Sequence, residues 1–242
     1  MIPDWPVAEH VNAVCTTRQG GVSEPPFDSL NLGDHVGDAA DAVAENRRRV
    51  GQVLGLPAEP RWLEQVHGVE VATMKAADGI PRADASVALQ PGEVSVVMTA
   101  DCLPVLFCDQ QGSRVAAAHA GWRGLCDGIL EQTLSKLGCP SAEVLVWLGP
   151  AIGPEQFEVG EAVRAAFIQH SPQAETAFRP GKTDGKWLAD IYQLARQRLR
   201  AQGVEHIYGG GFCTVSEPER FFSYRREGQS GRMASLIWLN NE

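Results

Sequence analysis

The stretch Val94–Gly124, VSVVMTADCLPVLFCDQQGSRVAAAHAGWRG, decides the fold of this chain. It holds two short apolar runs, Val94–Met98 and Val115–Ala118, which end before Cys102 and His119 respectively. Continuous apolar runs of this length, bounded by turn residues, are typical of strands that are buried on both faces of a sheet. We therefore expect the chemistry of the protein to lie where these two strands end.

The residues just after each run predict how the chain leaves the sheet. Pro104 cannot donate to a sheet ladder, so we expect the chain to bend or to lie on a sheet edge just after Cys102. Gly121 and Gly124 allow a tight turn after the second run, with a helix beginning near Leu125. A thiol beside a bend at a strand end is placed to face a cleft.

Length and composition set the class of protein. The chain has 242 residues, 44% of them hydrophobic and 21% charged, which is typical of a soluble globular protein. We expect one domain over residues 1–242, because this length supports a core of ordinary size. The 21 basic and 30 acidic residues give a net charge of −9, which opposes binding to nucleic-acid phosphates. A small anionic substrate stays open, because local arginines can outweigh the global charge.

The sequence also predicts where the protein works. No apolar run approaches the roughly 20 residues that span a bilayer, so no membrane contact is expected. The N-terminal residues lack the basic and apolar regions of a secretory signal, so we expect the cytoplasm. The six cysteines include no CxxC pair and several lie in apolar runs, where a reduced cysteine behaves as a small hydrophobe.

Apolar runs and helical periodicity predict the other elements. The expected strands are 11–17, 61–65, 69–74, 83–89, 144–148, 204–208, 221–225 and 233–239. The expected helices are 39–54 with Asp38 as its cap, 129–137, 162–170 and 187–202. Because strands and helices interleave without a strict βαβ rhythm, the predicted fold class is α/β in the layered α+β sense, a single domain with a mixed β-sheet and flanking helices.

Two polar segments near the N-terminus do not fit a strand or a helix. Arg18 stands beside Gly20 and Gly21, in a loop that either binds an anion or simply connects two strands. The segment 27–38 is irregular and contains His35. We expect this segment to fold over another part of the molecule.

Three potential metal ligands stand at turns or strand ends: His67, Cys102 and His119. Two imidazoles and one thiolate suit zinc, and a fourth position left to water would make the site catalytic. The ligands are separated by 35 and 17 residues along the chain, which matches no local zinc-finger spacing. Their convergence must therefore come from the fold.

Longer motifs around these residues resemble a known family. The segments 62–68 (WLEQVHG), 99–105 (TADCLPV) and 118–124 (AHAGWRG) resemble the three signatures of the family named both multicopper polyphenol oxidase (laccase) domain and purine nucleoside phosphorylase. Supporting matches are 29–32 (SLNL), 35–38 (HVGD), 149–153 (GPAIG) and 221–226 (FFSYRR). The matches follow one another in order over nearly the whole chain.

The resemblance implies a fold, a cofactor and an activity. The fold is a single α/β domain similar to the toxin-deamidase-like cysteine hydrolase fold, and one zinc ion is held by His67, Cys102 and His119. Family members are described as cleaving adenosine, inosine and methylthioadenosine with phosphate and as deaminating adenosine. The implied partners are a purine nucleoside and phosphate, and the same three residues together with Asp101 are the candidates for catalysis.

The residues favour zinc over copper. A laccase needs a trinuclear copper cluster lined by His-X-His pairs, whereas the six histidines of this chain include no such pair. A water bound to zinc has a lowered pKa and is a competent nucleophile at C6 of a purine. We therefore expect zinc and regard copper as the less suitable ion.

Phosphorolysis also needs a phosphate site and stabilisation of an oxocarbenium ion. Arginines offer bidentate geometry to the anion, so we consider the arginines that flank the motifs. The candidates for substrate or phosphate binding are Arg18, His35, Arg123 and Arg225, with Arg226 next to the last of these. Asp101 serves in this hypothesis as a general acid or as the residue that orients a ligand histidine, and its alternative role is to cap a turn.

Three alternatives stay open at this point. Cys102 with His119 is also the pairing of a cysteine nucleophile with its base, which predicts a hydrolase or deamidase, including one that edits cell-wall precursors. A polyphenol oxidase is the second alternative. The third is a structural zinc protein, which needs a fourth protein ligand. The sequence offers no clear one, because Cys108 is expected to point differently along its strand and Cys126 lies on the following helix; finding Cys126 on the metal would favour this alternative. The oligomeric state is not predicted.

Overall fold

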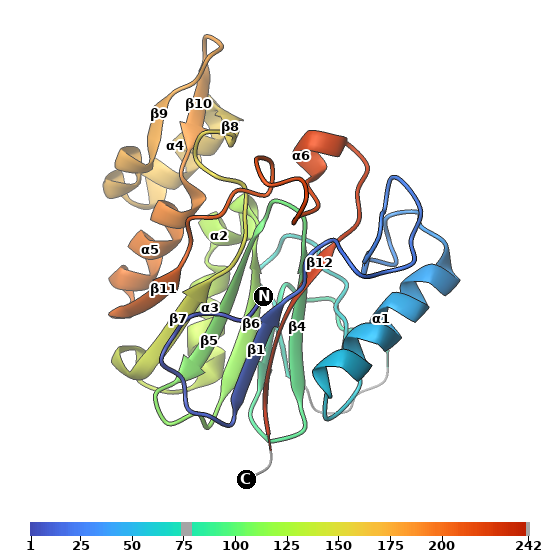
Figure 1. Ribbon diagram of the computed structural model, residues 1–242. Helices are drawn as coiled ribbons and strands as arrows, with labels where there is room; N and C mark the ends of the chain where they lie inside the picture. Colours follow the sequence, from blue (N-terminus) through green and yellow to red (C-terminus); the bar gives the residue numbers. More distant parts are fainter. Residues whose placement is uncertain (74–78, 241–242) are drawn as a thin grey trace.

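The computed structural model describes residues 1–73 and 79–240 and forms four layers, helix, sheet, sheet and helix (Figure 1). This arrangement confirms the predicted mixed α/β class with strands and flanking helices. Within the described ranges, no helix combines the length and the apolar character that crossing a bilayer requires.

The larger sheet has six strands in the order β11-β7-β5-β6-β3-β2. β11 runs parallel to β7, and β2 runs parallel to β3, whereas the pairs between β7, β5, β6 and β3 are antiparallel, so the sheet is mixed. Its strands are β2 (Val71–Thr73), β3 (Ala85–Ala88), β5 (Leu103–Asp109), β6 (Val115–Ala120), β7 (Val144–Leu148) and β11 (His206–Gly209).

The smaller sheet stacks on one face of the larger one. It is antiparallel, in the order β1-β12-β4, and its strands are β1 (Val11–Cys15), β12 (Met233–Leu239) and β4 (Val94–Thr99). Helix α1 (Ala40–Leu54) covers its outer face, where Val50 packs against Val96 and Leu236. The chain termini therefore meet in one sheet, because β1 and β12 are neighbours.

Three further helices cover the other face of the six-stranded sheet (Figure 1). They are α2 (Trp122–Asp127), α3 (Ile129–Leu137) and α5 (Ile191–Ala201). A small third sheet, β8-β10-β9, lies beside α4 and comprises β8 (Glu158–Gly160), β10 (Lys186–Ala189) and β9 (Phe178–Pro180). The short elements are α4 (Glu161–His170), α6 (Tyr224–Glu227) and two 3-10 turns, Ser141–Glu143 and Pro172–Ala177.

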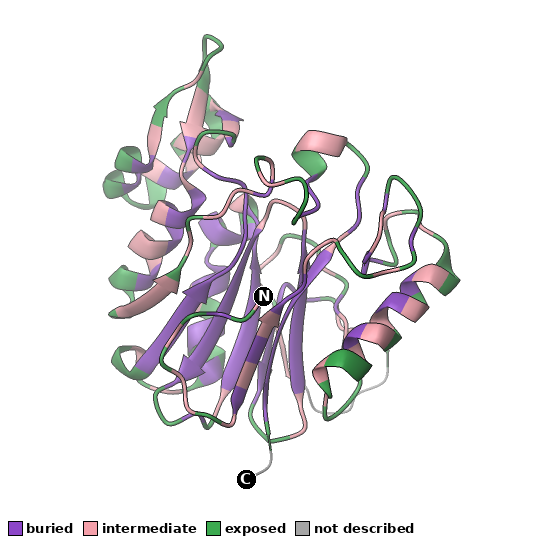
Figure 2. Ribbon diagram, viewed as in Figure 1, coloured by how far each residue is buried: buried purple, intermediate pink, exposed green. Residues whose placement is uncertain are grey.

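Alternate residues of the central strands face different layers. In β6, Ala116 and Ala118 pack against the helices, whereas Val115 and Ala117 pack in the core between the two sheets. Every residue of β4, β5, β6 and β12 is buried (Figure 2), which the continuous apolar runs predict for β4 and β6. By the same alternation His119 points to the inter-sheet side, at the end of the strand where the core opens.

The prediction that Pro104 places the chain at a bend or a sheet edge is wrong. Pro104 is the second residue of β5, which lies between β7 and β6 inside the sheet. Its ring removes one donor, but its carbonyl still accepts from the backbone N–H of Gly149 at 2.9 Å. Because Pro104 stands near the start of β5, the sheet loses only one backbone hydrogen-bond donor there. A prediction that treats proline as a strand breaker therefore misses the strand Leu103–Asp109.

Two further predictions differ from the structure in the type or the start of an element. Residues 221–225 were expected as a strand, but Phe221 and Phe222 are buried in a loop, and α6 follows with Ser223 as its cap. The helix expected over 187–202 begins at Ile191, because Asp190 caps it by accepting from the N–H of Gln193. A polar capping residue thus overrides the apolar pattern in both places.

Smaller differences follow the same logic. Asp38 does not cap α1, because the N-cap of that helix is Ala39. The Asp38 carboxylate instead accepts hydrogen bonds from the side chains of Ser23 and Asn31. The segment 61–65 forms only an isolated bridge between Glu64 and Arg82. The helix expected near Leu125 begins at Trp122, and Met74, the expected end of strand 69–74, lies outside the described residues.

Candidate functional site

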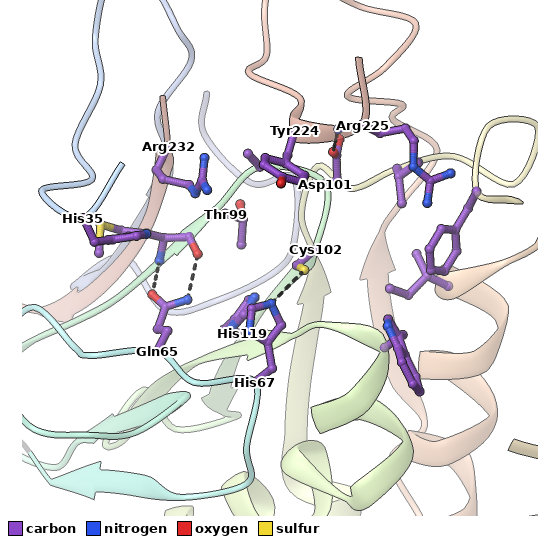
Figure 3. Close-up of a pocket in the computed structure, with 16 residues that line it drawn as sticks. His35, Gln65, His67, Thr99, Asp101, Cys102, His119, Tyr224, Arg225 and Arg232 are labelled. Atoms are coloured by element: carbon purple, nitrogen blue, oxygen red, sulfur yellow. Dashed lines mark hydrogen bonds between the residues drawn. The ribbon is translucent and has the colours of Figure 1, made fainter. Parts of the chain in front are cut away.

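A cavity of about 530 Å³ opens where the core between the two sheets ends (Figure 3). Its walls come from the ends of β4 and β6, from α2 and α6, and from the loops around His35 and Gln65. One wall is apolar and is made by Trp122, Ile152, Phe157 and Ile191. The opposite wall is polar, so the cavity suits a ligand with one flat apolar part and one anionic part.

The three predicted ligands His67, Cys102 and His119 meet in this cavity. Their donor atoms all lie within 4.8 Å of one another, and the His67 Nε2 atom lies 3.8 Å from the Cys102 sulfur. The two imidazole rings meet edge to face, with centroids 4.8 Å apart. His67 is exposed, Cys102 is half-buried and His119 is buried, so the set reaches from solvent into the core.

Asp84 holds two of these ligands in place. Its side chain is fully buried, and its carboxylate accepts from His119 Nδ1 at 2.8 Å. The same carboxylate accepts three backbone N–H bonds, from Val66, His67 and Gly68, at 2.7–3.1 Å. Because Nδ1 of His119 is engaged, Nε2 is left to face the cysteine, and this carboxylate–histidine arrangement is the one that orients metal ligands in proteins.

The turn that carries His67 has an unusual backbone. His67 has φ 61°, in the left-handed region that side chains other than glycine rarely adopt. The three N–H bonds to Asp84 stabilise this conformation, since they converge on a single buried carboxylate. A strained residue held in this way is typical of a functional site.

The surroundings favour the thiolate and the imidazolium. Burial opposes ionisation of Cys102, but the positive charge of His119 and the hydrogen bond from His67 outweigh it and lower the pKa of Cys102 to about 6. Burial also opposes the charge on His119, but Cys102 and Asp84 outweigh it and raise the pKa of His119 to about 9. The thiolate, which is the form that binds metals and acts as a nucleophile, is therefore the favoured state.

Gly121 leaves the space in which the three ligands meet. A Cβ atom at this position would lie 2.8 Å from Cδ2 of His67 and 3.1 Å from the Cys102 sulfur. Its backbone, with φ −63° and ψ 158°, is one that any residue adopts. The glycine is therefore required by the site and not by the local conformation.

Replacing Gly121 with alanine should displace the ligands without unfolding the chain. We expect metal affinity to fall by about 100-fold, because a displacement of about 1 Å in a constellation of this kind has an effect of that size. Equilibrium dialysis against zinc measures the affinity, and circular dichroism measures the fold. A G121A protein that binds zinc as tightly as the parent would contradict the role given to this glycine.

Asp101 lies at the cavity but its carboxylate is engaged elsewhere. Its Oδ1 accepts from the hydroxyl of Thr214 at 2.6 Å, and its Oδ2 accepts from the N–H of Arg225 at 2.7 Å. Asp101 also has a left-handed backbone, with φ 89°. It thus joins the turn between β4 and β5 to the first turn of α6, and the residue that contacts a ligand histidine is Asp84.

The predicted phosphate-binding residues separate into two groups. His35 and Arg225 line the cavity, although Nη1 of Arg225 donates to the carbonyls of Gln156 and Glu158. Arg18 lies in a different pocket and pairs with Asp28 and Glu227. Arg123 is exposed and stacks on the Trp122 ring, and Arg226 donates to the carbonyls of Thr214, Val215 and Phe221.

Four cavity residues or their partners were not identified from the sequence. Asp84 has one signal, an acidic residue directly before the apolar strand β3. Gln65 lies in the motif 62–68, but nothing in the sequence indicates that its side-chain amide exchanges two hydrogen bonds with the backbone of Met98 (Figure 3). Arg232 and Tyr224 line the cavity from a loop and from α6, so only the fold brings them there.

Cys108 and Cys126, the two cysteines considered as a fourth ligand, lie outside the group of three. Cys108 is buried in the core between the sheets. Cys126 lies with Asp127 and His170 in a separate group and does not line the cavity. In the described part of the chain, His67, Cys102 and His119 are grouped with no fourth histidine, cysteine or carboxylate.

Comparison with known proteins agrees with this description. The chain is 56% identical to a purine nucleoside phosphorylase of Pseudomonas aeruginosa over 241 residues, covering 100% of this chain and 98% of that protein. It is also 56% identical to the purine nucleoside phosphorylase YfiH of Escherichia coli K12 over 240 residues, covering 99% and 98%.

Solved structures show the same fold. A crystal structure of a Neisseria meningitidis protein has a TM-score of 0.95 at 51% identity, over 100% of this chain and 99% of that one. YlmD from Geobacillus stearothermophilus has a TM-score of 0.88 at 33% identity, over 96% and 93%. The family described as multi-copper polyphenol oxidoreductase laccase matches residues 12–240. This chain, whose motifs resemble that family, therefore belongs to it.

Proposed function

We propose that this chain is a zinc-dependent purine nucleoside phosphorylase that acts on adenosine, inosine and methylthioadenosine and also deaminates adenosine. The observation that carries the proposal is the convergence of His67, Cys102 and His119 in a cavity that has an apolar wall and also holds two arginines. The relatives named purine nucleoside phosphorylase support the phosphorolytic activity. The cytoplasm stays the expected compartment, since all six cysteines are free.

The residues at the site fit a zinc ion. Two imidazoles and a thiolate are a donor set typical of catalytic zinc sites, which use three protein ligands. Asp84 on His119 supplies the outer carboxylate that such sites use to orient a ligand. A bound zinc ion would supply Lewis-acid stabilisation of negative charge.

The walls of the cavity account for the two substrates. Trp122, Phe157 and Ile152 give a flat base an apolar surface and exclude water from it. In phosphorolysis a phosphate oxygen bonds to C1′ of the ribose while the bond from C1′ to the purine nitrogen breaks. The purine leaves with the electron pair and takes up a proton. Cationic side chains on the polar wall bind the phosphate and hold it against the ribose.

A second candidate is a cysteine-dependent hydrolase or deamidase. The observation in its favour is that Cys102, His119 and Asp84 stand in the order of nucleophile, base and orienting carboxylate. Polyphenol oxidation receives less support, because in the described residues no metal-ligand group holds more than two histidines, and a copper cluster requires a larger set.

The proposal is tested by turnover. Purified protein of known zinc content is incubated with adenosine, inosine or methylthioadenosine, with and without phosphate, while base release and ammonia are followed. We expect base release that depends on phosphate, and ammonia from adenosine alone that does not. The variant His67→Ala, shown to be folded, should do neither. Zinc-replete protein that turns over none of the three nucleosides would contradict the proposal.

A further inference from the structure

Arg232 lies on the polar wall of the cavity, directly before β12, and was not among the phosphate-binding residues expected from the sequence (Figure 3). Its Nη1 group donates to the carbonyls of Ser230 and Gly231 at 2.8 and 3.1 Å. These bonds fix the guanidinium to its own turn. Among the described residues, Nε and Nη2 have no hydrogen-bond partner, so these donors are available to a ligand.

Among the described residues, this guanidinium has no direct ion-pair partner, since no carboxylate lies within ion-pair distance of Arg232. Burial lowers the pKa of Arg232, and Cys102, Asp101 and Tyr224 only partly offset this effect. A half-buried cation without a direct ion-pair partner is stabilised when a ligand brings a negative charge to it.

The polar segment near the N-terminus folds over Arg232. Asn31 is fully buried, and its Oδ1 accepts from the backbone N–H of Arg232 at 2.9 Å. The N–H of Leu32 donates to the carbonyl of Arg232 at 3.1 Å. Gly33 makes room for the side chain, since a Cβ there would lie 2.7 Å from Cγ of Arg232. This segment thus fixes both the backbone and the stem of the arginine.

The same segment brings a second donor to the polar wall. His35 follows Gly33 by two residues and lines the cavity near Arg232 (Figure 3). Gln229 donates to the carbonyl of Val36 at 3.4 Å, which joins the His35 loop to the turn that carries Arg232. Burial and then the charge of Arg232 lower the pKa of His35, whereas Asp34, whose carboxylate lies 3.6 Å from Nδ1 of His35, acts in the opposite direction. The neutral ring has one N–H donor.

We propose that Arg232, with His35 beside it, forms the subsite for the phosphate co-substrate, and that Asn31 and Gly33 position the guanidinium. This inference rests on the proposed function, because it takes the bound anion to be the phosphate of phosphorolysis. The two available nitrogens of a guanidinium bind two phosphate oxygens together. Arg225 lines the same cavity, and its Nη1 likewise donates to two carbonyls, but its side chain is exposed whereas that of Arg232 is half-buried.

Steady-state kinetics test the arginine. Arg232→Gln should raise the KM for phosphate by about 10- to 100-fold, the size expected for lost charge-assisted hydrogen bonds, with the dissociation constant for inosine nearly unchanged. Arg232→Lys keeps the positive charge but loses the two parallel N–H donors of the guanidinium, so its KM for phosphate should lie between those of the parent and Arg232→Gln. The control is Arg200→Gln, an exposed arginine on α5 that should leave both constants unchanged. Zinc content is measured in every variant.

A glycine pair tests the positioning role while Arg232 stays in place. Gly33→Ala should raise the KM for phosphate more than it lowers kcat, because the added methyl displaces the stem of the arginine. Gly51→Ala is the matched control, since a Cβ at that position meets nothing within 4 Å. An unchanged KM in folded G33A protein would overturn the positioning role.

Binding of inorganic phosphate, followed by phosphorus NMR with and without inosine, separates this inference from the proposed function. Binding that is lost in Arg232→Gln supports the subsite even when no nucleoside is cleaved. Phosphorolysis with a phosphate KM unchanged in Arg232→Gln overturns the subsite and leaves the proposed function intact. Absence of phosphate binding to the zinc-loaded parent protein overturns the subsite as well. If Arg232→Gln does not fold, phosphate binding and the KM for phosphate are measured in Arg232→Lys and Gly33→Ala instead, and the same outcomes support or overturn the subsite.

Discussion

Replacing Cys102 with alanine should lower the zinc content of the purified protein from about one ion per chain to near zero. Nucleoside phosphorolysis should fall at least a thousandfold, roughly the several kcal/mol that a catalytic metal contributes. The thiolate is the only anionic ligand of the three, and without it the ion retains two imidazoles, one of them exposed. Elemental analysis and base release, measured on the same sample, check both expectations.

Cysteine chemistry is separated from metal chemistry by a control and an alkylation experiment. Cys139→Ala should keep zinc and activity, since Cys139 is half-buried and lies outside the cavity. In the zinc site, iodoacetamide should react with Cys102 only after a chelator removes the ion. Wild-type protein that is active without metal and is inactivated by alkylation would instead support the cysteine hydrolase.

Asp84→Asn should weaken zinc binding by about 10- to 100-fold, the usual effect of removing the outer carboxylate of a ligand histidine. It should also lower the free energy of unfolding by about 3 kcal/mol, because four donors converge on this buried carboxylate. An amide retains one acceptor oxygen but turns its other end into a donor that faces N–H groups. Zinc titration and chemical denaturation of the metal-free protein measure the two effects.

Ser86 provides the matched control for Asp84. It is buried in the same strand region, but its hydroxyl has no hydrogen-bond partner. Ser86→Ala should therefore leave zinc affinity unchanged and should not destabilise the chain. Zinc affinity in Asp84→Asn equal to that of the parent would mean that His119 keeps its orientation without the carboxylate, and the account of the site given above would be wrong.

The sequence by itself predicted the strands β4 and β6 and singled out His67, Cys102 and His119 as one group. Val94–Met98 and Val115–Ala118 are continuous apolar runs, and a strand buried on both faces has no other pattern available to it. His67, Cys102 and His119 were identified as one group by their chemistry and by the resemblance of their motifs to a family, and the structure brings them together. Their catalytic role and the choice of zinc stay predictions.

Tertiary structure alone decided which partners these residues have. Asp84 reaches His119 because β3 and β6 are neighbours in the sheet, and the two residues are 35 positions apart in sequence. Arg232 reaches the cavity because Asn31, 201 positions earlier, holds its backbone. The periodicity of a segment reports which of its faces is buried, but the free energy of a polar contact depends on which strand or loop lies opposite. The two buried strands and the three grouped residues could therefore be predicted from the sequence. Asp84 and Asn31, which hold His119 and Arg232 in place, could not.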